Sequence, residues 1–275
     1  MNAVSETQSN PNYSPTPAVL LLFFSYGIAF IATFAIHELG HLIVDLIKGS
    51  TITEFVVHPF LLSYVSASPL IESFDVYIAG TLLAIVVCSL IGSIFWKKRS
   101  TSNFPLLFFV PMTFLIESMN ILTAPTNPGS DFYKIMEFTG LPANFFIIIG
   151  IVFLCMGIFF FMTLFPLIGI EPEGRKSTTF IVIFLGFILY NILLVVYTYL
   201  FATEEFLFYR ANNFLIIGGM LALIITILYV TLYRKYYRKL PFTLQTEKGT
   251  VTWKDLQIPG VVFILILVFS LLFFN

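Results

Sequence analysis

Seven apolar stretches, each about as long as a membrane-crossing helix, dominate this sequence. About 20 consecutive apolar residues are enough to span a bilayer as an α-helix. The composition agrees, because 58% of the 275 residues are hydrophobic, only 11% are charged and the mean hydropathy is +0.95. These features predict an all-α polytopic membrane protein. The predicted transmembrane helices cover residues 18–47, 76–96, 104–123, 143–168, 178–201, 212–233 and 258–274.

The stretches predict a single membrane domain that follows a polar N-terminal tail. Residues 1–17 lack Lys and Arg and are rich in Asn, Ser and Pro, which is typical of a disordered tail and not of a signal peptide. Residues 18–142 hold the first three spans, and residues 143–275 add further transmembrane helices without a motif. Cys88 and Cys155 lie in apolar stretches, where we expect them to act as small buried hydrophobic side chains. The net charge of −1 gives no reason to expect a nucleic-acid partner.

The distribution of Lys and Arg predicts the orientation of the helices. With seven spans, the side that holds the N-terminus carries all but three of the 14 basic residues. Cytoplasmic loops carry an excess of Lys and Arg, so the N-terminus of this multi-pass protein is expected in the cytoplasm. The side opposite the N-terminus carries Lys48, Lys134 and Arg210. The N-terminal side carries Lys97, Lys98, Arg99, Arg175, Lys176, Arg234, Lys235, Arg238, Lys239, Lys248 and Lys254.

The connection between the first two spans, residues 49–74, differs from the others. It contains "STITEFVVHPFLLSYVSAS", which is rich in β-branched and aromatic residues and has a His-Pro break in the middle. This pattern predicts two short strands, arranged as a hairpin at the membrane surface. The alternative is an irregular loop whose apolar side chains dip into the interface.

The first span contains the string "FAIHELGHLIVD", in which polar and ionisable residues interrupt an apolar run. His37 and His41 are four residues apart, so in a helix they lie on one face about 6 Å apart along the axis. Both imidazoles can then reach one metal ion. Glu38 lies about 100° around the helix, close enough to hold a water molecule without being a ligand. This is the HExxH pattern, in which two histidines bind zinc and the glutamate is the general base.

The location of this motif strengthens the metal-site hypothesis. The chain has three histidines, and two of them lie in this motif inside a predicted span. Ionisable groups at membrane depth are functional-site candidates by default. The alternative is a pair of buried histidines bonded to a neighbouring carboxylate such as Glu117.

Zinc needs a third protein ligand, which must come from another segment. The stretch "ESMNILTAPTNPGSDFYKIM", residues 117–136, interrupts the end of the third span with polar residues, Pro and Gly. Broken backbone at that depth is tolerated where it is buried in protein or lines a watery cavity. Asp131 can supply an oxygen ligand there, and its alternative role is to cap a short helix that begins in "SDFYKIMEF".

Three other residues are candidates for roles near the metal. His58, in the strand-like connection, is the alternative metal ligand, because three histidines suit zinc well. Glu117 is a weaker candidate ligand and fits better as a hydrogen-bond partner of His37 or His41. Asp45 lies one turn beyond His41 on the same helical face, where a supporting or interfacial role is expected.

With these residues in place, the first half of the chain resembles the site-2 protease family of intramembrane zinc metalloproteases. The resemblance comprises a span with HExxH, a second span, and a third span that ends in "NILTAPTNPGSDF", where Asn120, Pro125 and Asp131 follow in order. It implies that Asp131 is the third ligand of one zinc ion per chain. It also implies that Asn120 holds an extended substrate segment or steadies the reacting groups.

The second span adds a weaker part of this resemblance. In "YIAGTLLAIV", Ala79 and Gly80 match the small residues of the family's Gly-Pro segment, and Thr81 stands where Pro is common. The strands after HExxH are also a family feature, which implies that they hold the substrate as an added strand. The chain resembles a divergent member without a PDZ domain.

The resemblance implies that residues 18–142 are a catalytic core. The expected activity is that of a zinc metalloendopeptidase, which hydrolyses peptide bonds of membrane-embedded or membrane-tethered proteins in contact with the lipid bilayer. Two alternatives differ in class: a catalytically inactive, protease-like regulator or chaperone, and a transporter with a polar intramembrane site.

Overall fold

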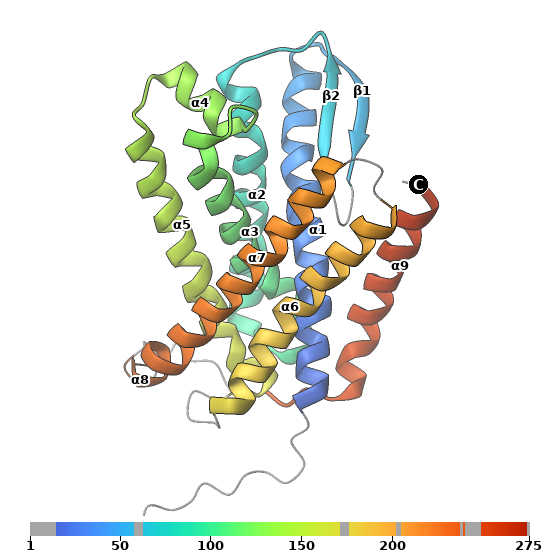
Figure 1. Ribbon diagram of the computed structural model, residues 1–275, viewed down its shortest axis with the longest axis vertical. Coiled ribbons are helices and arrows are strands. Elements are labelled where there is room, and N and C mark those ends of the chain that lie inside the picture. The colour runs from blue at the N-terminus through green and yellow to red at the C-terminus, as the bar shows by residue number, and fades with distance from the viewer. Residues whose placement is uncertain are drawn as a thin grey trace, which may run out of the picture.

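Long helices packed side by side make up most of the computed structural model (Figure 1). Successive long helices run in opposite directions through the bundle. The structure describes residues 15–57, 63–170, 176–201, 205–236 and 249–273, and in addition residue 239. The long helices are α1 (Pro15–Ile47), α2 (Phe74–Phe95), α3 (Phe104–Thr123), α5 (Ala143–Leu164), α6 (Lys176–Phe201), α7 (Glu205–Leu228) and α9 (Gln257–Phe273).

Within the described residues, five helices are long and apolar enough to cross a membrane. With their flanking turns they cover Pro15–Ile47, Phe74–Lys98, Thr101–Thr126, Ala143–Ile168 and Thr178–Leu200. This confirms an all-α membrane protein. Among the residues searched, Ile217–Leu232, which covers the end of α7 and part of the following π-helical segment, is a shorter apolar helix. Because this segment is short and α9 has 17 residues, the count of seven spans stays a prediction.

Short elements connect or extend the long helices. One of them, α4 (Asp131–Thr139), follows α3 and ends at Gly140, whose positive φ of 64° suits glycine. The others are 3₁₀ turns at Trp96–Lys98, Thr101–Asn103, Ala124–Thr126, Phe165–Ile168 and Trp253–Leu256, a π-helical segment at Tyr229–Tyr233, and α8 (Arg234–Tyr236).

Helix α3 occupies the centre of the bundle. About 72% of its membrane-crossing window is buried, the largest share among the five candidate spans. Its buried side chains include Leu107, Phe108 and Leu115, which join one apolar core with residues of α1, α5 and α6. Pro111 lies inside α3, and neighbouring helices can compensate for the backbone hydrogen bond that proline removes. A group on the inner faces of α1 and α3 is therefore shielded from lipid.

The predicted strands are present as an antiparallel hairpin. Strand β1 (Thr51–Val56) pairs with β2 (Tyr64–Ser68), with Thr51 opposite Ser68 at the base. The chain reverses after α1 at Gly49, whose φ is +89°. Strand β1 then runs back along the C-terminal part of α1, and β2 returns beside it in the opposite direction (Figure 1). The hairpin thus lies beside the bundle, and its predicted place at the membrane surface stays a prediction.

Three connections meet at the opposite end of the bundle. The backbone N–H of Gly249 donates to the carbonyl of Pro166 at 3.0 Å, and the Thr101 hydroxyl donates to the carbonyl of Leu167 at 3.1 Å. The α2–α3 connection, the end of α5 and the approach to α9 therefore share this end. Residues 1–14, most of the predicted disordered tail, lie outside the described residues, and α1 begins at Pro15.

Candidate metal centre

His37 and His41 lie one turn apart on α1, and both are buried. Their Nε2 atoms are 3.1 Å apart. The Nδ1 atoms face other helices: that of His37 lies 2.9 Å from Oε1 of Glu117 in α3, and that of His41 lies 2.7 Å from the carbonyl oxygen of Val76 in α2. The i,i+4 spacing predicted from the sequence therefore brings the two Nε2 atoms together.

The Nδ1 contacts determine which ring nitrogens are free to bind a ligand. The Val76 carbonyl can only accept a hydrogen bond, so Nδ1 of His41 must be the donor. Nδ1 of His37 likewise donates to the Glu117 carboxylate. In the neutral form of each ring, Nε2 then carries a lone pair and no hydrogen.

Asp131 is the first residue of α4, and local packing fixes its position. Ser130 is the N-cap, since its hydroxyl accepts a hydrogen bond from the backbone N–H of Tyr133 at 3.3 Å. The next residues on the inner face, Phe132 and Ile135, are buried against Ile121 and other apolar residues. The short helix predicted here is present, but Ser130 caps it, so the Asp131 side chain is free for another role.

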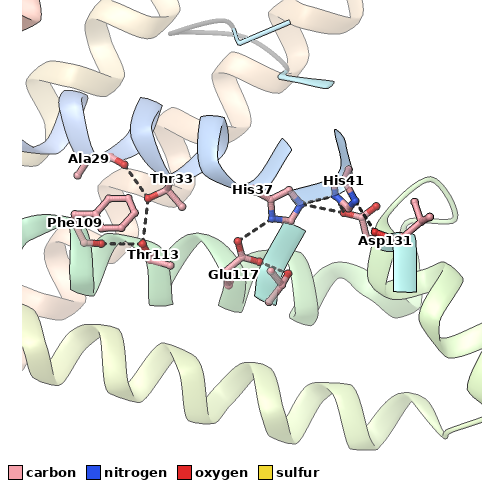
Figure 2. Close-up of polar contacts among 10 residues, drawn as sticks. Ala29, Thr33, His37, His41, Phe109, Thr113, Glu117 and Asp131 are labelled. Atoms are coloured by element: carbon pink, nitrogen blue, oxygen red, sulfur yellow. Dashed lines mark hydrogen bonds and ion pairs between the residues drawn. The ribbon is translucent and has the colours of Figure 1, made fainter. Parts of the chain in front are cut away.

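That side chain points at the two histidines (Figure 2). Oδ2 of Asp131 lies 3.1 Å from Nε2 of His37 and 3.2 Å from Nε2 of His41. Burial alone would raise the pKa of the Asp131 carboxyl. A histidine ring protonated at Nε2 can donate to this carboxylate, and that interaction outweighs burial and holds the pKa of Asp131 well below its usual range. Asp131 is therefore a carboxylate at neutral pH.

The three residues form a group that could hold a metal ion, with one ligand atom from each within 4.8 Å of the others. Two lone pairs and a carboxylate oxygen converge there, which favours a cation. Protonation of both Nε2 atoms would instead point two N–H groups at each other across 3.1 Å. Tetrahedral zinc bonded at about 2.0–2.2 Å separates its ligand atoms by about 3.3 Å, close to the separations found here.

Glu38 follows His37 on α1 and is half-buried. Among the described residues it makes no hydrogen bond or ion pair, although it interacts electrostatically with both histidines and with Asp131. A carboxylate beside the ligands with free oxygens can accept a proton from a water molecule in the same space. Solvent can approach from the Asp131 side, where that side chain is 30% exposed, against 5% for His37 and 10% for His41.

Glu117 is fully buried in α3, and both of its oxygens accept hydrogen bonds. Oε1 faces Nδ1 of His37, and Oε2 accepts the hydroxyl hydrogen of Thr81 in α2 at 2.6 Å. Glu117 thus contacts the side of His37 that points away from Asp131. This contact fits the predicted supporting role and equally fits the alternative of buried histidines bonded to a carboxylate, and Glu117 is not part of the group that could hold a metal ion.

Gly80, also singled out in the sequence, lies against both imidazoles. A Cβ atom there would come within 2.6 Å of Nε2 of His41 and 2.7 Å of Nε2 of His37. On the facing helix α1, next to His41, a Cβ atom on Gly40 would lie 2.4 Å from the carbonyl oxygen of Ala79 in α2. Glycine on both helices is what allows α1 and α2 to approach so closely at the site.

The remaining predicted residues lie apart from the ligand group or outside the described chain. Asn120 lies one turn beyond Glu117 in α3, and no described contact joins its side chain to the ligand residues. Asp45 is buried, and its Oδ1 has no hydrogen-bond partner among the described residues. His58, the alternative ligand, lies outside the described residues.

Sequence reasoning missed three features of the site. They are the hydroxyl of Thr81 on Glu117, the backbone carbonyl of Val76 on His41, and a hydrogen bond between Thr33 and Thr113, which are 3.3 Å apart one turn before His37 and Glu117 (Figure 2). The four-residue spacing of Thr33, His37 and His41 could have indicated the polar stripe on α1. The partners on α2 and α3 have no comparable local signal.

Comparison with protein-family models, with curated proteins and with solved structures gives no match, so the case for the chemistry of this site rests on its geometry.

Proposed function

We propose that the protein is an intramembrane zinc metalloprotease of the site-2 protease type, with seven spans and one zinc ion per chain. The observation that carries the proposal is the convergence of His37, His41 and Asp131 next to the carboxylate of Glu38, between apolar helices. Two imidazole nitrogens and one carboxylate oxygen are a donor set that zinc accepts, and catalytic zinc sites keep a fourth position for water.

In the proposed peptide hydrolysis, the zinc ion and Glu38 have different roles. When bound, zinc would lower the pKa of a coordinated water and stabilise negative charge on the carbonyl oxygen of the substrate. Glu38 accepts the proton of the attacking water and later delivers it to the nitrogen of the leaving amine. Its freedom from protein hydrogen bonds within the described residues suits a group that must bind and release a proton.

The hairpin supports a protein substrate. A peptide in lipid is helical, and it must be extended before its carbonyl can be attacked. The sheet has only two described strands, β1 and β2, so each strand has an outer edge, and the hairpin packs along the helix that bears the histidines. An extended substrate segment that pairs with one edge would recover backbone hydrogen bonds that it loses on unwinding.

The alternatives fit these observations less well. A transporter is expected to place ionisable groups in several spans, but Ala143–Ile168 and Thr178–Leu200 contain no Asp, Glu, Lys, Arg or His. An inactive regulator has no need of Glu38, which is present and free of protein hydrogen bonds among the described residues.

Glu38→Gln tests the proposal. We expect it to retain zinc, because Glu38 is not a ligand, and to lower cleavage by about 10²–10⁴-fold, the usual contribution of a general base. Cleavage is measured with a panel of single-span reporter proteins tagged on both sides of the membrane. Glu137→Gln, an exposed acidic side chain in α4, is the matched control and should cleave normally. A wild-type protein that binds zinc but releases no tag from any reporter would contradict the proposal.

A further inference from the structure

Glu117 is a carboxylate buried in the middle of three helices. Its side chain is fully shielded, and burying a charge is costly unless its oxygens are hydrogen-bonded. Here one oxygen accepts from His37 in α1 and the other from Thr81 in α2, at 2.9 and 2.6 Å. A single side chain of α3 therefore connects α1 and α2 directly at the metal site.

A second pair on the same two helices fixes the register of α1 against α3. Thr33 and Thr113 lie 80 positions apart in the sequence, as His37 and Glu117 do, and each pair forms one contact between the parallel helices (Figure 2). Sliding α1 along α3 would break both contacts at once. The Thr33–Thr113 pair does not touch a ligand residue. A change in this pair can therefore affect the register of the two helices without acting on the His37 ring directly.

We propose that Thr81 and Glu117 form a positioning pair that sets the tautomer and orientation of His37 and thereby the metal affinity of the site. Glu117 keeps the hydrogen of His37 on Nδ1, which leaves the Nε2 lone pair for the metal. Thr81 holds the carboxylate in that orientation through its second oxygen. Neither residue touches the metal position, and the inference rests on the proposed metal site.

Helix α2 then controls both histidines without contributing a ligand. Its Val76 carbonyl orients His41 directly, and its Thr81 hydroxyl orients His37 through Glu117. Gly80, next to Thr81, leaves the space in which the two Nε2 atoms meet. Helix α2 thus acts on the histidines through the backbone carbonyl of Val76, the absence of a side chain at Gly80 and the hydroxyl of Thr81. None of these groups is a typical metal ligand, so the sequence of this span shows no ligand pattern.

The test measures zinc affinity of the purified full-length protein by competition with a fluorescent chelator. Partners that hold a metal-binding histidine are typically worth about 10–100-fold in metal affinity, so we expect that loss in Glu117→Ala. We expect Thr81→Val to weaken zinc binding about tenfold and Thr81→Ser, which restores a hydroxyl, to bind like wild type. The double variant Thr81→Val with Glu117→Ala should bind zinc as weakly as Glu117→Ala alone, since the hydroxyl acts only through the carboxylate.

Thr113→Val is the matched control, because it also removes the hydroxyl of a buried threonine in the same bundle. Zinc affinity close to wild type in Thr113→Val and weakened in Thr81→Val supports the positioning pair. Equal losses in both variants, or full affinity in Thr81→Val and Glu117→Ala, would overturn it. A wild-type protein without zinc would instead refute the proposed function itself.

Discussion

At the scale of single residues, Asp131 carries more of the metal-site proposal than either histidine. His37 and His41 are held on one face by the geometry of a single helix, and this holds wherever the helix forms. Asp131 lies 94 positions beyond His37 and reaches the site only because α4 docks through Phe132 and Ile135. The assignment of the third ligand therefore depends on tertiary packing, and it is the assignment that most needs a direct test.

We expect Asp131→Ala to lose most of its zinc, because the variant leaves only two imidazole ligands. Metal content of the purified protein is the measurement. His58→Ala is the comparison, and it should retain zinc if the ligands are His37, His41 and Asp131. The reverse pattern, with zinc retained in Asp131→Ala and lost in His58→Ala, would replace the carboxylate with a third histidine.

The sequence predicted the histidines and the aspartate for different reasons. The i,i+4 spacing is a local property, so the placement of the two imidazoles on one face of α1 follows from the motif alone. Asp131 was a candidate ligand because it lies in the polar, broken end of the third span, and the resemblance to a family implied the same role, but no periodicity in the chain requires it. Thr81 was visible only as a departure from that resemblance, and its hydrogen bond to Glu117 gives the departure a physical reason.

At the scale of elements, the close contact of α1 with α2 makes the site possible. Gly40 and Gly80 lie where any Cβ atom would press on backbone or on an imidazole. Because backbone atoms of Ala79 cannot rotate away, an added methyl group must push the helices apart. The distance between α1 and α2 therefore controls the geometry at His37 and His41.

Gly80→Ala should weaken zinc binding at least tenfold, because its Cβ atom would occupy the space between the two Nε2 atoms. Overpacking of this kind also costs about 1–3 kcal/mol of stability. Gly92→Ala is the control in the same helix, where the nearest atom, Cγ2 of Val110, is at an ordinary contact distance of 3.6 Å. Zinc affinity is compared between the two variants, and an equal affinity would show that the approach of α2 is unimportant for the metal.

Helices and strands were more predictable from the sequence than their placement. The bounds of α3, residues 104–123, match the prediction, because the length of an apolar run is a local property. The hairpin was predicted as two strands, but its direction depends on the reversal at Gly49 and on packing against α1. The cap of α4 was assigned to Asp131 in one alternative, and the neighbouring Ser130 provides it instead.

At the scale of the whole molecule, the two ends of the bundle differ in character. One end holds the metal centre, α4 and the base of the hairpin, whereas the described basic residues Lys97, Lys98 and Arg99 follow α2 at the other end (Figure 1). Arg99 also lies 5.8 Å from the ring of Trp96, an aromatic residue type favoured at membrane–water interfaces. The charge bias therefore predicts that the candidate metal centre lies at the end away from the cytoplasm.

Labelling of single cysteines from each side of the membrane tests this orientation together with the crossing of α3, α5, α6 and α7. The background is Cys155→Ser, because Cys155 is exposed while Cys88 is buried. Ser102→Cys and Thr250→Cys place exposed thiols near the end where Gly249 bonds to Pro166, and Leu141→Cys places one at the metal-site end.

We expect a membrane-impermeant thiol reagent added outside intact cells to label Leu141→Cys and to leave Ser102→Cys and Thr250→Cys unlabelled until the membrane is opened. An even number of crossings separates Ser102 from Thr250 if α3, α5, α6 and α7 all span the bilayer, so these two must behave alike. Opposite labelling of Ser102→Cys and Thr250→Cys would mean that one of these four helices does not cross. If all three positions label in the reverse sense, these four helices still cross but the protein is inverted, which would place the candidate metal centre on the cytoplasmic side.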